Sequence, residues 1–176
     1  MKIDGEIPTT ERLFIIWVDP GVTNGIVLWN DGAIQVWGQV SFDELSTTLS
    51  SAVIQLRAHN HDPHILIGCE RFVITANTHK KPYAVETIQA WGVVKAIALH
   101  FETAYEDSQK SNVKNFITDD KLKRLGGFKF GMKHANDAAR HVFYYLAESG
   151  LLSPAEVDMV LPQYDEEGSD DVGRHR

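Results

Sequence analysis

The stretch Leu13–Asp19, with the sequence LFIIWVD, decides the fold class of this chain of 176 residues. Six consecutive apolar residues, rich in β-branched and aromatic side chains, end at a carboxylate, which is typical of a strand buried on both faces of a sheet. Two shorter apolar runs follow at Ile26–Trp29 and Ile34–Val40, separated by the hairpin signal Asn30-Asp31-Gly32. The first forty residues therefore predict three strands in an antiparallel meander.

Helices and strands alternate through the rest of the chain. Ser41 and Glu44 have the spacing of a capping box, which marks the start of a helix. In chain order we expect a helix from Ser41 to about His59, a strand at His64–Glu70, a helix from about Tyr83 to His100, a short strand at Thr103–Glu106, one or two short basic helices within Ser111–Lys123 and a long helix at His134–Ser149. This order predicts an α/β fold, a mixed five-stranded sheet with a three-strand antiparallel meander plus parallel strands, flanked by helices.

Composition excludes several classes of protein. The chain is 43% hydrophobic and 23% charged, which suits one domain with a sizeable core. No apolar run approaches the roughly 20 residues of a membrane span, and Met1–Glu11 has no signal-peptide pattern. The single Cys69 excludes a disulfide framework and a multi-cysteine zinc site. We therefore expect a cytoplasmic protein with no membrane partner.

Charge is distributed unevenly along the chain. The net charge is −7, but seven acidic residues and no Lys or Arg lie between Ser153 and Gly173, so residues 1–152 are close to neutral. Within that body, Lys110–Lys133 carries seven basic residues against two acidic ones. We expect a folded domain at 1–152 and an acidic, largely disordered tail at 153–176. The basic stretch permits a nucleic-acid partner without requiring one.

Carboxylates end two of the predicted strands. Asp19 closes the first strand and Glu70 the fourth, and neighbouring strand ends in an open α/β sheet converge on one crevice. His134 and Asp137 lie three residues apart, on one face of the first turn of the last long helix. If these side chains meet, they suit hard cations such as Mg²⁺ or Mn²⁺, and a pair of ions roughly 3.5–4 Å apart could hold a phosphate. From composition and spacing alone, ordinary helix-capping and solvent-exposed acids are an equally good interpretation.

Three motifs, in order, resemble those of the RuvC-type Holliday junction resolvases, which have an RNase H-like fold. They are Asp19–Gly25 (DPGVTNG) after a buried strand, Glu70 at the end of another strand, and His134–Ala139 (HANDAA) at the start of a helix. Ile88–Gly92 (IQAWG) and Val113-Lys114 also match the family's pattern. The resemblance extends from about Leu13 to Ala147, which is most of the chain.

The resemblance implies a metal-dependent endonuclease that resolves four-way DNA junctions, and other branched DNA in addition, as a homodimer. It implies that Asp19, Glu70 and Asp137 are catalytic carboxylates that bind two Mg²⁺ ions, with Mn²⁺ as a substitute. His134 would be a fourth ligand or orient the attacking water. Lys114 and Lys121 would contact the cleaved phosphate region. Bacteriophage members look closer than bacterial ones, so we expect a phage origin and a site of action in the host cytoplasm.

The chain departs from the family pattern in three places. The segment after Lys114 lacks the usual glycine-rich run, the acidic tail is additional, and an aromatic thought to wedge into the junction comes two residues after Glu70, as Phe72, instead of three. Phe72 could equally be a core residue. Arg71 could bind phosphate or form a surface ion pair, and Lys80 and Lys81 could grip the DNA backbone or lie in a solvated loop.

Two other functions fit parts of the sequence. A junction-binding protein that does not cut would keep the same fold and partners. The Asp-x-Gly-x-Thr-Asn pattern at Asp19–Asn24 also resembles the phosphate loop of actin-like sugar kinases, but these need roughly twice this length and a second such loop. Among the histidines, His59, His61 and His64 give only a weak zinc signal, and we expect a structural role for His141, about 10 Å along the helix from His134.

Overall fold

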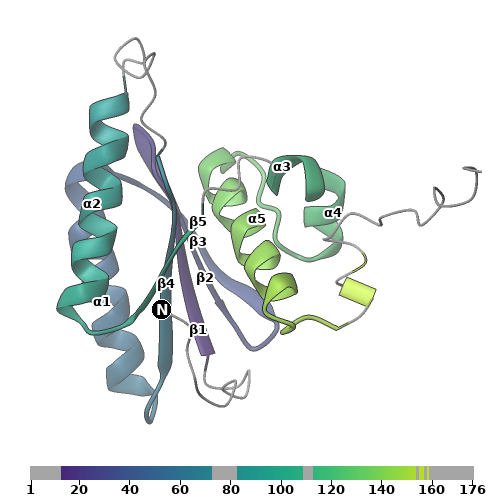
Figure 1. Ribbon diagram of the computed structural model, residues 1–176, viewed down its shortest axis with the longest axis horizontal. Helices are drawn as coiled ribbons and strands as arrows, with labels where there is room; N and C mark the ends of the chain where they lie inside the picture. Colours follow the sequence, from purple (N-terminus) through teal and green to yellow (C-terminus); the bar gives the residue numbers. More distant parts are fainter. Residues whose placement is uncertain (1–12, 73–82, 109–112, 154, 157, 159–176) are drawn as a thin grey trace, which may run out of the picture.

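The computed structural model describes residues 13–72, 83–108, 113–153, 155, 156 and 158. Five strands form one sheet in the order β3-β2-β1-β4-β5 (Figure 1). They are β1 (Leu13–Asp19), β2 (Thr23–Asn30), β3 (Ala33–Ser41), β4 (His64–Glu70) and β5 (Ala104–Ser108). The first three strands are antiparallel, and β4 and β5 run parallel to β1. The predicted α/β fold with a mixed five-stranded sheet is confirmed.

Helices cover both faces of this sheet (Figure 1). One face carries α1 (Phe42–His59) and α2 (Ala84–His100), and the other carries α5 (Lys133–Glu148) with the short helices α3 (Val113–Phe116) and α4 (Asp119–Arg124) beside it. Alternate side chains of β1 enter two separate cores. Ile15 and Trp17 pack on the α5 side, whereas Ile16 and Val18 pack on the α1 and α2 side. This two-sided burial is why the β1 sequence is continuously apolar.

Most predicted element boundaries are confirmed to within one or two residues. β1 and β4 begin and end where the sequence predicts, and Ser41 caps α1 with the predicted capping box, in which its backbone N–H donates to Glu44 Oε2 over 3.0 Å. β2 begins at Thr23, three residues earlier than predicted, because Asn24 and Gly25 still pair with β3. No helix among the described residues is long and apolar enough to cross a membrane.

Glycine at position 25 lets α5 approach the sheet closely. A Cβ atom on Gly25 would lie 2.1 Å from the carbonyl carbon of His134, far inside van der Waals contact. The buried Asn24 beside it holds the preceding turn, because its Oδ1 accepts from the Gly21 backbone N–H over 3.3 Å. The N-terminal turn of α5 is therefore held directly against β2, next to the end of β1.

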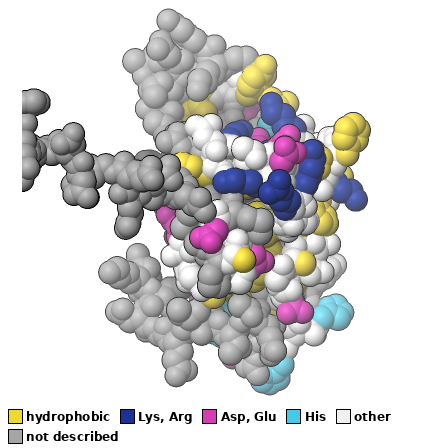
Figure 2. Space-filling model, turned by 90° about the vertical axis from the view of Figure 1, so that its right-hand side faces the viewer, with side chains coloured by type: hydrophobic (Ala, Val, Ile, Leu, Met, Phe, Trp, Pro, Cys, Tyr) yellow, Lys and Arg dark blue, Asp and Glu magenta, His cyan; other side chains and the backbone are white. Residues whose placement is uncertain are grey.

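The outer surface of α3, α4 and the start of α5 is basic. Lys and Arg side chains gather on this face of the molecule (Figure 2). The exposed basic residues of this surface are Lys114, Lys123, Arg124, Lys129 and Lys133. Residues 159–176, which contain most of the predicted acidic tail, lie outside the described part of the chain.

Candidate active site

The parallel pairing of β1 with β4 brings two carboxylates together at one edge of the sheet. Val18 pairs with Cys69, so the next residue of each strand, Asp19 and Glu70, lies at the same end. Asp19 shares strand parity with Ile15 and Trp17, and its side chain therefore projects toward α5. Its carboxyl group is buried, with 6% of the residue exposed.

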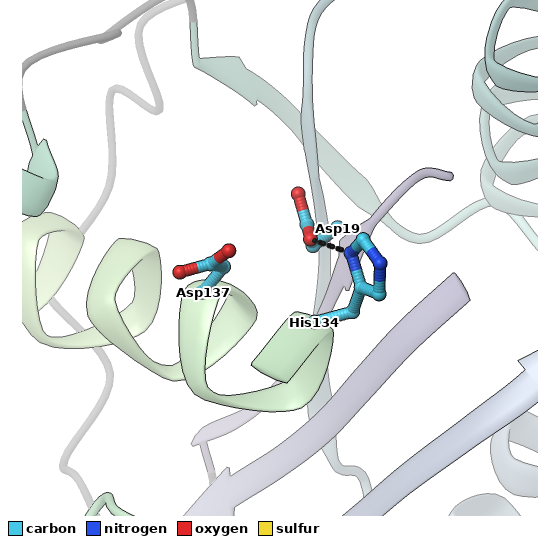
Figure 3. Close-up of side chains that lie close together, drawn as sticks. All are labelled: Asp19, His134 and Asp137. Carbon is cyan, nitrogen blue, oxygen red and sulfur yellow. Dashed lines mark hydrogen bonds and ion pairs between the residues drawn. The ribbon is translucent and has the colours of Figure 1, made fainter. Parts of the chain in front are cut away.

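The first turn of α5 places an imidazole and a third carboxylate beside Asp19 (Figure 3). His134 Nδ1 lies 2.8 Å from Asp19 Oδ2. Asp19, His134 and Asp137 can each offer one ligand atom such that all of these atoms lie within 4.8 Å of one another. Because His134 and Asp137 are three residues apart, one helical face points both side chains at the strand end.

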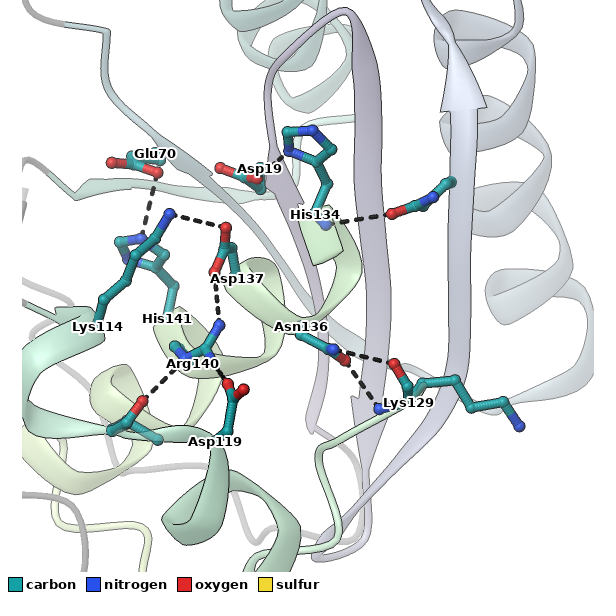
Figure 4. Close-up of polar contacts among 12 residues, drawn as sticks. Asp19, Glu70, Lys114, Asp119, Lys129, His134, Asn136, Asp137, Arg140 and His141 are labelled. Carbon is teal, nitrogen blue, oxygen red and sulfur yellow. Dashed lines mark hydrogen bonds and ion pairs between the residues drawn. The ribbon is translucent and has the colours of Figure 1, made fainter. Parts of the chain in front are cut away.

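Two cations hold the carboxylate of Asp137 (Figure 4). Lys114 Nζ, from α3, donates to its Oδ2 over 2.7 Å, and Arg140 Nη1 donates to its Oδ1 over 2.5 Å. The Arg140 guanidinium also donates to the Ile117 carbonyl oxygen over 2.8 Å and to the Asp119 carboxylate. A buried arginine thus ties Asp137 to the segment that carries α3 and α4.

Glu70 has its own partner on α5. His141 Nε2 lies 3.5 Å from Glu70 Oε2, and the His141 ring stacks on Trp17 with centroids 5.6 Å apart and an interplanar angle of 7° (Figure 4). His141 therefore has more than the expected structural role, because it also contacts the predicted site carboxylate Glu70. The periodicity of His134, Asp137 and His141 on one helical face was the available signal.

Burial and mutual repulsion shape the pKa values of this cluster. Burial raises the pKa of Asp19 to about 6, the contact with His134 opposes this rise, and Glu70 adds to it. Burial also acts to raise the pKa of Glu70, but His141 and Asp19 lower it, and the net direction is downward. The Asp19 carboxylate raises the pKa of His134. Burial therefore disfavours the charged form of Asp19, whereas the neighbours of Glu70 favour its charged form.

The structure places the residues predicted to contact DNA in several different environments. Arg71 forms a two-bond ion pair with Asp107, at 3.0 and 2.5 Å, which is the alternative interpretation of this residue. Phe72 is half-buried. Lys121 lies in α4, where its backbone N–H donates to Thr118 Oγ1, and none of the described contacts joins its side chain to the carboxylates. Lys80 and Lys81 lie outside the described residues.

Sequence reasoning missed Arg140. It lies one helical turn after Asp137, and its side chain is almost completely buried between α5 and the segment of α3 and α4. The burial of Arg140 becomes evident only once the packing of these helices is known. In the sequence, Arg140 simply follows the two alanines of the HANDAA motif, and nothing there marks it as part of the site.

The sheet order and the helix arrangement define an RNase H-like fold. Within that class, the chain is similar to RuvC of Thermus thermophilus. A structure of that protein in complex with Holliday junction substrate superposes with a TM-score of 0.60 at 14% identity, covering 78% of this chain and 96% of the other. A second T. thermophilus RuvC structure gives a TM-score of 0.56 at 15% identity over the same shares. The predicted RuvC-like fold is confirmed.

At this level of identity the similarity is one of fold. No family model matches the sequence, and no curated protein sequence matches it.

Proposed function

We propose that this chain is a metal-dependent endonuclease that cuts branched DNA and resolves four-way junctions as a homodimer. The observation that carries the proposal is the meeting of Asp19, His134 and Asp137, with Glu70 beside Asp19, at the carboxyl end of β1 and β4 in a RuvC-like sheet. The similarity to a RuvC structure with Holliday junction substrate supports branched DNA as the partner.

The donor set suits hard divalent cations. Three carboxylates and one imidazole supply the oxygen and nitrogen atoms that Mg²⁺ and Mn²⁺ accept, and burial makes the charged form of Asp19 unfavourable without a compensating cation. Asp19, Glu70, His134 and Asp137 would hold the metal, with two ions per site. Such ions supply Lewis-acid stabilisation of phosphoryl oxygens and lower the pKa of a bound water.

The chain's own cations orient the carboxylates and face the phosphate. Arg140 holds one oxygen of Asp137, and His141 lies against Glu70, so both carboxylates are positioned before substrate binds. Lys114 contacts the buried Asp137, yet 53% of its side chain is exposed. Its ammonium group can therefore bind a non-bridging oxygen of the cleaved phosphate. Figure 2 shows the basic surface of α3, α4 and the start of α5, which would bind the DNA backbone.

The test compares the wild type with Asp137→Asn on labelled four-way junction, flap and linear duplex, each with Mg²⁺ or Mn²⁺. The substitution preserves shape and removes a charge. Asp62→Asn is the matched control, because Asp62 is an exposed carboxylate before β4, at the opposite end of the sheet. We expect paired symmetric nicks in the junction from the wild type and the control, and at least about a 10³-fold loss in Asp137→Asn.

Other outcomes would change the proposal. Cutting confined to flaps would keep the active site and demote the chain to a structure-selective nuclease. Saturable junction binding with no cleavage in either metal would contradict the catalytic proposal and favour a binding protein.

A further inference from the structure

The turn Lys129–Met132, between α4 and α5, exposes a phenylalanine almost completely. Phe130 is 93% exposed, the most exposed of the large hydrophobic side chains in the described part of the chain. Single exposed apolar residues are common on protein surfaces, so exposure alone carries no function. The conformation of the backbone around Phe130 distinguishes it from other exposed apolar residues.

A buried side chain of α5 fixes this turn. Asn136 Oδ1 accepts from the Lys129 backbone N–H over 2.8 Å, and Asn136 Nδ2 donates to the Lys129 carbonyl oxygen over 2.9 Å (Figure 4). The Met132 backbone N–H donates to the same carbonyl over 3.3 Å, and Gly131 adopts a left-handed φ of 77°. The turn is therefore pre-organised, and it presents Phe130 to solvent from a fixed base.

The surroundings of Phe130 are positively charged. Lys129 and Lys133 flank it in the sequence and are exposed, and Lys123 and Arg124 are exposed at the end of α4. The Lys129 ammonium lies 5.9 Å from the centroid of the Trp37 ring, on β3, and Trp37 Nε1 donates to the Gly127 carbonyl oxygen over 3.2 Å. An exposed aromatic ring with cations beside it suits a nucleobase between two phosphates, because the base stacks while the cations bind the backbone.

We propose that Phe130 is a stacking platform for an unstacked base of branched DNA. This inference rests on the proposed function and adds to it a residue outside the carboxylate cluster. Asn136 precedes Asp137 on α5, so one helix positions both the platform and a site carboxylate. A base leaving the duplex at a branch would stack on Phe130 while the neighbouring phosphates contact Lys129 and Lys133.

The experiment measures Kd by fluorescence anisotropy, in Ca²⁺ to prevent turnover, for four-way junction and linear duplex. Phe130→Ala should weaken junction binding roughly 5- to 150-fold, the range for loss of one base–aromatic contact, and leave duplex binding unchanged. Phe130→Trp should retain junction binding, whereas Phe130→Leu should resemble Phe130→Ala. The fluorescence of a 2-aminopurine placed at the branch should change on binding the wild type and not on binding Phe130→Ala.

A second pair of variants tests the turn itself. Gly131 and Gly32 both have a φ of 77° and open space where a Cβ would lie, but Gly32 is in the β2–β3 hairpin, away from the carboxylate end of β1. Gly131→Ala and Gly32→Ala should therefore lower the thermal midpoint similarly, since both force a side chain into the left-handed region. Only Gly131→Ala should weaken junction binding.

Equal junction affinity for wild type and Phe130→Ala would overturn the inference. A change in molar mass in Phe130→Ala, measured by light scattering, would also overturn it and assign Phe130 to a contact between copies. If Asp137→Asn abolishes cleavage while Phe130→Ala binds normally, only the stacking platform fails. If the wild type binds no DNA at all, the proposed function fails.

Discussion

The two faces of β1 differ in what they bury. On one face, Phe14, Ile16 and Val18 meet α1 and α2, whose buried residues are all apolar. On the other face the core is apolar only as far as Trp17, and α5 then buries four polar or charged residues near the carboxylate end of the strand: Asn136, Asp137, Arg140 and His141. One strand thus packs in an apolar core on one side and contributes to the candidate site on the other.

This difference follows from the physics of burial. Removing an apolar group from water lowers the free energy, whereas burying a carboxylate raises it unless a cation or hydrogen-bond donor compensates. The α1 and α2 face should therefore tolerate no polar substitution but should contribute nothing to cleavage. The α5 face should be less stable than its size suggests, because it buries Asp19, whose charged form is disfavoured by that burial.

Among the substitutions considered, Asp19→Asn should have the largest effect on cleavage. Cleavage should fall by at least about 10³-fold, because a candidate metal ligand is lost. The metal-free protein should nevertheless become more stable. The pKa of Asp19 is raised to about 6 from 3.8 in the unfolded chain, so the wild type loses stability as pH rises between these values. In chelator, the variant's advantage in Tm should grow from near zero at pH 4 to a few degrees at pH 7.

The pH series of Tm, recorded for wild type, Asp19→Asn and the exposed control Asp62→Asn, checks this sign. An advantage for Asp19→Asn that shrinks as pH rises would show that Asp19 is stabilised in its charged form and would contradict the described environment.

Arg140→Gln should be strongly destabilising, because it leaves Asp137 buried with one cation instead of two. Removing one partner of a buried ion pair costs about 3–5 kcal/mol, and here the Ile117 carbonyl also loses a donor. Cleavage should fall as well, since Asp137 then keeps only the contact with Lys114. Chemical denaturation and junction cleavage at a temperature far below Tm measure the two effects separately.

Asp119→Asn is the matched control for that variant. It removes another partner of Arg140, but the Asp119 side chain is 61% exposed, so we expect a loss of under about 1 kcal/mol. If Arg140→Gln were as mild as Asp119→Asn, the buried arginine would not be what holds Asp137.

Leu49→Ala tests the opposite face of β1, which packs against α1 and α2. Leu49 is completely buried on α1, and its truncation should lower the free energy of unfolding by about 2–5 kcal/mol. The cleavage rate per folded molecule should not change, because none of the described contacts joins α1 or α2 to Asp19, Glu70 or Asp137. A loss of cleavage in the fully folded variant would contradict the separation of the two faces.

The sequence was sufficient to predict the sheet and the four candidate ligands, but not the side chains that hold them. Continuous apolar runs identify β1 and β4, and their parallel pairing alone brings Asp19 and Glu70 to one edge. Helical periodicity then explains His134 and Asp137. The roles of Arg140 and His141 depend on how α3, α4 and β4 pack against α5, which involves residues far apart in the sequence. Local pattern does not encode such contacts, and it also gave no sign that Asn136 fixes the Phe130 turn.

Gly25 sets how closely the two parts of the candidate site approach each other. The strand end carrying Asp19 and the helix end carrying His134 and Asp137 are separate structural parts, and their spacing is set where the backbone of β2 meets the backbone of α5. A single methyl group at position 25 would push the two parts away from each other, so the candidate ligands would all be present but farther apart. The distance between the two parts of the candidate site therefore depends on the absence of a side chain at position 25.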